Sequence, residues 1–242
     1  TLIMTLLFFI TFFFQKNFLQ FLWIPLVFFS QFLFLAKLMT PDAITALLFL
    51  ISVMFLVKNK LYASYLIMAL TLTFRPDMIV AAGLTGLLPL IKKDFRMPIF
   101  NSIIFLSIYF LISASISHNG WWSHFYTSLV STQSNLNLFD PSFDLNKYFE
   151  ILIGNTLWVL NDINYVGWFS LTFIIIFLSA YFALENKSQW INLIALSLSV
   201  AIIIKFIIFP KVDSRVYLAI LVPAIYTFSL NYLNLREKID TK

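Results

Sequence analysis

The chain has 242 residues, of which 61% are hydrophobic and 11% are charged, and its mean hydropathy is +0.91. It has too little polar surface to coat a soluble globule, so we expect an integral membrane protein. The formal charge of +5 comes from basic residues dispersed among short loops, which argues against a nucleic-acid partner, and the lack of cysteine excludes disulfides and thiolate metal sites.

Hydrophobic runs rich in Phe, Ile and Leu are separated by short polar breaks, at intervals close to the ~20 residues that a helix needs to cross a bilayer. The sequence therefore predicts an all-α, polytopic bundle of about nine transmembrane helices in a single domain, residues 1–242. The first, fourth and fifth spans are short for a full crossing, so tilting, kinking or partial re-entry stays open for them. The predicted spans are 2–14, 18–38, 43–57, 61–74, 77–91, 97–116, 166–184, 190–209 and 216–234.

The polar breaks between these spans alternate between two kinds. Lys-rich clusters at 58–60, 92–96 and 236–238 take turns with breaks that combine an acid with Pro or Arg, at 40–42, 75–77 and 210–215. By the positive-inside rule the Lys-rich side is cytoplasmic. We therefore expect a multi-pass protein of the bacterial inner membrane, with the second kind of break on its extracytoplasmic face.

Asp42 opens the third predicted span, directly after Thr-Pro. It is a candidate catalytic carboxylate. The commonest use of Asp at such a position is to cap a helix N-terminus, and we favour the cap.

Further charged residues gather at the predicted outer ends of the spans. A charge within or at the edge of hydrocarbon costs about 2.5–3.5 kcal/mol on insertion scales, so each needs a reason. Converging cations could hold a phosphate or diphosphate, with arginine making bidentate contacts; alternatively, each arginine pairs with a neighbouring aspartate and closes the outer helix ends. The candidate phosphate-site residues are Arg75, Asp77, Lys205, Lys211 and Arg215, and the candidate ion-pair partners are Asp42, Asp77 and Asp213.

One connection is long, residues 117–165, and it is expected outside the membrane. Near its start lie His118, Trp121, Trp122 and His124. Two interpretations stay open for these aromatic residues. They could form a belt at the membrane interface, or a flat surface that binds a sugar or another substrate. The two histidines have no adjacent carboxylate, so we expect no metal site there.

The same connection continues with the segment Asp144–Glu150, which is followed by an apolar run that reaches Leu160. This run predicts a helix at the membrane interface.

A family resemblance is carried by residues 18–91. A proline-containing helix leads to Thr40-Pro41-Asp42, and a helix, a Lys-Asn-Lys break and another helix then lead to Arg75-Pro76-Asp77. This order resembles the middle of GT-C-type glycosyltransferases, which include the protein O-mannosyltransferases and aminoarabinose transferases. Arg215, before the last span, matches more loosely.

The resemblance implies an enzyme that takes a sugar from a polyprenyl-phosphate-linked donor. The sugar would pass to a lipid, glycan or protein acceptor on the extracytoplasmic face, without a nucleotide sugar or other cofactor; a metal requirement stays open. In that family the acidic catalytic residue lies in the first outer loop. That loop would precede Thr1, so we expect an N-terminally truncated chain that lacks the principal base.

Two other functions fit a membrane protein of this composition. A transporter or flippase of lipid-linked saccharides would also carry outer-face cations, but the chain has only five Gly and no GxxxG in a predicted span. A non-catalytic subunit of envelope polysaccharide assembly would leave Arg75, Lys205 and Arg215 without a shared role.

Overall fold

The computed structural model describes residues 41–116, 144–161, 190–208 and 215–240, and all regular structure in these ranges is helical. The predicted all-α class is therefore confirmed for this part of the chain. In chain order the elements are α4 (Pro41–Val57), α5 (Leu61–Phe74), the 3₁₀ turn η2 (Pro76–Met78), α6 (Ile79–Gly86), the 3₁₀ turn η3 (Leu88–Lys92), α7 (Arg96–Ile116), α9 (Leu145–Asn161), α11 (Trp190–Ile208) and α12 (Arg215–Asp240).

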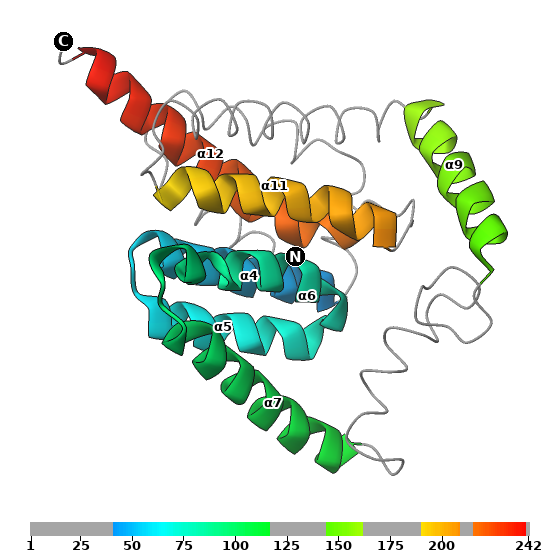
Figure 1. Ribbon diagram of the computed structural model, residues 1–242, viewed down its shortest axis with the longest axis horizontal. Helices are drawn as coiled ribbons and strands as arrows, with labels where there is room; N and C mark the ends of the chain where they lie inside the picture. Colours follow the sequence, from blue (N-terminus) through cyan, green and yellow to red (C-terminus); the bar gives the residue numbers. More distant parts are fainter. Residues whose placement is uncertain (1–40, 117–143, 162–189, 209–214, 241–242) are drawn as a thin grey trace.

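Five helices close into a ring. Helix α4 packs on α5, α5 on α6, α6 on α11, α11 on α12, and α12 returns to α4, while α7 lies outside the ring against α5 (Figure 1). Helix α9 stands apart from the ring at the edge of the view. The ring brings the first described helices of the chain against the last two.

The core of the ring contains one apolar face of α4 and the apolar part of α12, residues 219–228. On α4 the fully buried side chains of Ala46, Phe49, Leu50 and Val53 recur at the spacing of one helical face. On α12 every side chain from 219 to 228 is buried, as expected of a helix that is apolar all round and surrounded by neighbours.

Buried hydrogen bonds set the register of neighbouring helices. The hydroxyls of Ser52 on α4 and Ser64 on α5 each donate to the other's carbonyl oxygen, at 2.9 and 2.8 Å. The Tyr65 hydroxyl donates to the Gly86 carbonyl oxygen at 2.7 Å, and the Trp190 indole donates to the Leu56 carbonyl oxygen at 3.1 Å. These contacts hold α4 antiparallel to α5 and to α11.

The bundle consequently has two ends of different chemistry. At the end we call the lysine end, α4 finishes and α5 begins at Lys58–Lys60, and η3 gives way to α7 at Lys92–Arg96. At the opposite end, which we call the aspartate end, α4 and α12 begin and α5 and α11 finish. The alternation of polar breaks in the sequence thus corresponds to two physical ends of the bundle.

Two predicted spans differ from the observed elements. The span predicted at 77–91 is interrupted: α6 ends at Gly86 and a 3₁₀ turn follows, because Pro89 has no amide proton to continue an α-helix and its ring would clash with the preceding turn. The span predicted at 216–234 continues instead to Asp240, so the basic cluster at 236–238 lies inside α12. The other described spans begin and end within two residues of their predicted limits.

One described helix, α11, is both long and apolar enough to cross a membrane by itself. At 1.5 Å per residue its 19 residues extend about 28 Å. The other apolar helical stretches found there have 10–17 residues and include only parts of α7 (Arg96–Ile108) and α12 (Ala219–Phe228). Nine crossings therefore stay a prediction, and the predicted spans 2–14, 18–38 and 166–184 lie outside the described residues.

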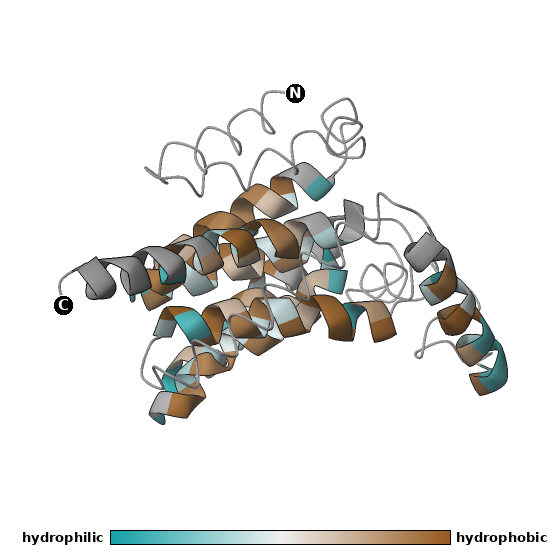
Figure 2. Ribbon diagram, turned by 90° about the horizontal axis from the view of Figure 1, so that it is seen from above, coloured by the Kyte–Doolittle hydropathy of each residue, from teal (hydrophilic) through white to brown (hydrophobic). Residues whose placement is uncertain are grey.

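Large apolar side chains are also exposed on the outside of several helices, and hydrophobic residues recur along most helices in Figure 2. On α7, Ile99, Ile103, Leu106 and Leu111 are each more than half exposed. A soluble protein rarely leaves so continuous an apolar face without a partner.

Helix α9 confirms the helix predicted within the long connection. Its first turn is capped by Asp144, whose carboxylate accepts the Asn146 amide at 2.9 Å. The Tyr148 side chain is buried, and its hydroxyl donates to the Ile207 carbonyl oxygen in the last turn of α11. This bond ties α9 to the aspartate end of the bundle.

Candidate functional site

Arg75 and Asp77 are brought together by the local sequence Arg-Pro-Asp. Helix α5 ends at Phe74, and Arg75 is extended (φ −139°, ψ 91°) because the proline ring that follows disfavours helical backbone in the preceding residue. Pro76 then begins η2, which places Asp77 in its first turn, as the sequence predicts. The two charged side chains therefore leave the same tight turn.

The Arg75 guanidinium and the Asp77 carboxylate form a two-point ion pair. Arg75 Nε donates to Asp77 Oδ1 at 2.9 Å and Arg75 Nη2 donates to Oδ2 at 2.7 Å. Parallel bonds of this kind fix both the position and the plane of the guanidinium. Arg75 is therefore held in one orientation by the residue two positions further along the chain.

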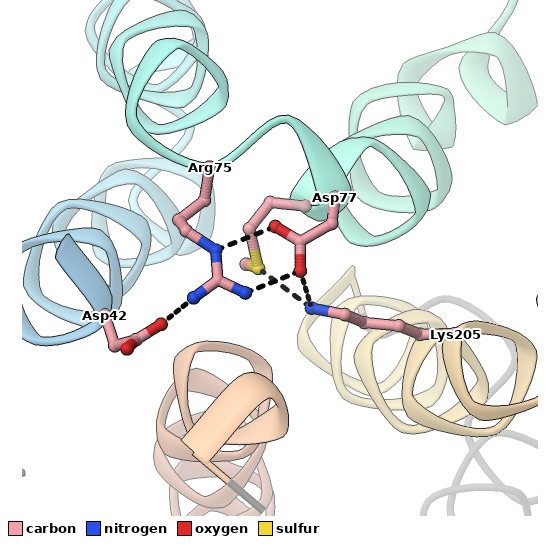
Figure 3. A network of polar contacts seen from close by, with 5 residues as sticks. Asp42, Arg75, Asp77 and Lys205 are labelled. Carbon is pink, nitrogen blue, oxygen red and sulfur yellow. Dashed lines mark hydrogen bonds and ion pairs between the residues drawn. The ribbon is translucent and has the colours of Figure 1, made fainter. Parts of the chain in front are cut away.

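Asp42 approaches the same guanidinium from α4. Its Oδ1 pairs with Arg75 Nη1, on the opposite side of the group from Asp77 (Figure 3). Because α4 begins at Pro41, Asp42 lies inside the first turn, and the N-cap role that we favoured is wrong. The carboxylate is used instead in a contact between two helix ends.

Lys205 completes the group from the last turn of α11. Its ammonium lies 2.9 Å from Asp77 Oδ2, and no part of the side chain is exposed. Met78 Sδ is 3.9 Å from the same nitrogen, and the Tyr217 ring of α12 lies with its centroid 5.9 Å away. A buried ammonium is tolerated here because a carboxylate and an aromatic face surround it.

We call these four side chains, Asp42, Arg75, Asp77 and Lys205, the ion cluster. They come from three separate parts of the chain and meet at the aspartate end of the ring (Figure 3). With all four ionised the cluster is formally neutral, two carboxylates against two cations. It can orient cations toward a ligand, but an anion that binds there must compete with the aspartates.

Of the two interpretations of the cations, the structure bears on the ion pair between an arginine and a neighbouring aspartate, and phosphate binding stays a prediction. The predicted pairing with Asp77 or Asp42 is confirmed, and Arg75 in fact pairs with both. The sequence did not predict that Lys205 pairs with Asp77. It did indicate that both residues lie near helix ends on the same side of the bundle, the aspartate end. The contacts of Met78 and Tyr217 with Lys205 had no signal in the sequence.

The remaining predicted site residues are less completely placed. Arg215 begins α12, two residues before Tyr217, so its backbone lies at the aspartate end of the bundle. The other five candidates lie outside the described residues: Lys211, His118, Trp121, Trp122 and His124. Within the described ranges, no three His, Asp or Glu side chains come together in a way that could hold a metal ion.

Comparison with known proteins adds no relative: no family model, curated protein or solved structure matches the chain. The site must therefore be interpreted from its own chemistry.

Proposed function

We propose that the chain is part of a membrane glycosyltransferase that uses a polyprenyl-phosphate-linked sugar on the extracytoplasmic face. The observation that supports this most is the convergence of Arg75 and Lys205, two cations, at one end of an apolar helix bundle. A pair of fixed cations at the depth of a helix end is suited to a phosphate at the level of the lipid headgroups.

Membrane insertion is supported by the outside of the bundle. Composition, the length of α11 and the exposed apolar faces all fit hydrocarbon as the surrounding medium. The clustering of lysines at one end, with the ion cluster at the other, fits a cytoplasmic lysine end and an extracytoplasmic ion cluster.

The proposed reaction needs a cation where negative charge develops. The acceptor hydroxyl oxygen attacks the anomeric carbon of the sugar, and the bond from that carbon to the phosphate oxygen breaks. The carrier phosphate leaves with the bonding electrons, while the hydroxyl proton passes to a carboxylate base. Arg75 would bind the phosphate and stabilise its added charge as the bond breaks.

Arg75→Ala and Arg215→Ala test this assignment in membranes from cells that express the protein. The assay supplies a panel of polyprenyl-phosphate-linked hexoses and pentoses with a membrane extract as acceptor, and it measures release of polyprenyl phosphate. Each variant should lose about 10²- to 10³-fold in rate, because each removes a cation that stabilises the leaving phosphate. Arg75→Lys should also be strongly impaired, since an ammonium lacks the two-point fork.

Lys93→Ala is the matched control, because it removes a cation from the lysine end. It should keep the wild-type rate, and all variants should elute as the same monodisperse species. Unchanged transfer in both Arg75→Ala and Arg215→Ala would reject the phosphate assignment.

A transporter of lipid-linked saccharides is the second candidate, and the interrupted segment Pro76–Lys92 favours it. Discontinuous helices beside a charged site are common in transporters, where they line the substrate path. Proteoliposomes distinguish the two functions: a transporter moves the intact lipid-linked saccharide across the bilayer, whereas a transferase releases polyprenyl phosphate.

A further inference from the structure

The two aspartates of the ion cluster are bound in unequal ways. Asp77 accepts two hydrogen bonds from Arg75 and also pairs with Lys205, so three contacts depend on it. Within the ion cluster, Asp42 pairs only with Arg75, at Nη1. Loss of Asp77 would disorganise both cations, whereas loss of Asp42 would leave their mutual arrangement in place.

The contact with Asp42 is made at Arg75 Nη1, the guanidinium nitrogen that Asp77 does not use. Nε and one N–H of Nη2 are used by Asp77, which leaves the side formed by Nη1 and the second N–H of Nη2 for another oxyanion. About a fifth of the Arg75 side chain is exposed (21%). An anion can therefore reach Arg75, and one that binds through Nη1 and Nη2 competes with Asp42 for Nη1.

Charge balance indicates which anion fits this exchange. The four side chains are neutral together, and Asp42 remains in the chain after it is displaced, so a ligand with one negative charge leaves a net charge of −1, the smallest excess that an anion can add. A sugar joined to a lipid through a single phosphate is a phosphodiester, which carries one negative charge.

We propose that Asp42 is an exchangeable counter-ion, which a singly charged lipid phosphodiester replaces at Arg75 while Asp77 continues to hold Arg75 and Lys205 in place. The inference rests on the proposed function, because it names how the donor's phosphate enters the site. It assigns Asp42 and Asp77 opposite effects on binding, although both are aspartates of one cluster.

Binding of methyl farnesyl phosphate, a singly charged isoprenoid phosphodiester, to the purified protein in detergent tests the proposal by titration calorimetry. Asp42→Asn should bind this probe roughly threefold to tenfold more tightly than wild type, because the competing carboxylate is gone. Asp77→Asn removes the same charge but should bind more weakly, because Arg75 and Lys205 lose the group that orients them. Asp94→Asn, at the lysine end, should bind like wild type.

Equal tightening by Asp42→Asn and Asp77→Asn would show a general effect of charge and overturn the exchange. Unchanged or weaker binding by Asp42→Asn would overturn it as well, as would the absence of binding to every form. If Asp77→Asn does not fold, the comparison of Asp42→Asn with Asp94→Asn decides alone.

Short-chain phosphatidylglycerol, which is also a singly charged phosphodiester, distinguishes the source of the ligand. Tighter binding of the farnesyl ester supports a polyprenyl carrier, and tighter binding of phosphatidylglycerol contradicts it. Tighter binding by Asp42→Asn, together with no transfer by the full protein that contains this chain, would reject the proposed function and keep the exchange. Transfer by the wild type together with unchanged binding by Asp42→Asn would reject only the exchange.

Discussion

Lys205 shows at the scale of one residue how a charge is kept inside an apolar helix. Its ammonium has no exposed surface and depends on Asp77, which in turn holds Arg75. Breaking a buried ion pair from one side costs more than replacing both partners, because the remaining charge stays desolvated. The pair therefore specifies how the end of α11 meets the turn after α5.

Asp77→Asn should lower the free energy of unfolding by about 2–3 kcal/mol, because charge-assisted bonds to two cations are lost at a largely buried position. In a Lys205→Met background the same change should cost less than half as much, since no buried ammonium then needs the carboxylate. Unfolding by SDS in mixed micelles measures both differences. Equal costs in the two backgrounds would mean that Asp77 and Lys205 are not coupled.

At the scale of elements, small polar residues decide how closely α4 and α5 approach. Ser52 and Ser64 are fully buried, and each hydroxyl reaches the backbone of the other helix. Such contacts require that the two backbones lie near each other, which small side chains allow. The pair thus fixes the antiparallel register that carries Asp42 and Arg75 to the same end of the bundle.

Ser52→Ala should cost about 1 kcal/mol of unfolding free energy, the net value of a hydrogen bond between helices. Ser52→Leu should cost about 2 kcal/mol or more, because the added volume forces the two helices apart. Ser102→Ala is the matched control: its hydroxyl donates to Pro98 in its own helix at an exposed position, so its loss should be nearly neutral. Equal stability of Ser52→Leu and wild type would contradict the close packing.

For individual helices, the sequence predicts some features and leaves others undetermined. The limits of α5 follow directly from a hydrophobic run between Lys60 and the Arg-Pro-Asp break, because side-chain chemistry along one segment determines them. For the span 77–91 the sequence leaves tilting, kinking or partial re-entry open, since proline permits several outcomes in a buried helix. The sequence could not predict that Lys205 pairs with Asp77, because this pairing depends on which helices pack against one another in the ring.

At the scale of the whole molecule, the proposed function requires that the two ends of the bundle face opposite sides of a membrane. The lysine end carries exposed Lys58 and Lys60, and the aspartate end carries the ion cluster and the attachment of α9. A phosphate site for a lipid-linked donor is useful only if the two ends are separated by the bilayer. The proposed function therefore depends most on this orientation.

Single cysteines measure that orientation directly, because the chain has none of its own. Lys58→Cys marks the lysine end, and Asn146→Cys marks α9 at the aspartate end; both positions are exposed. In intact cells whose outer envelope is permeable to the reagent, a membrane-impermeant maleimide should label Asn146→Cys at once and Lys58→Cys only after the inner membrane is opened. Labelling of both from the same side, or of Lys58→Cys alone in intact cells, would contradict the account.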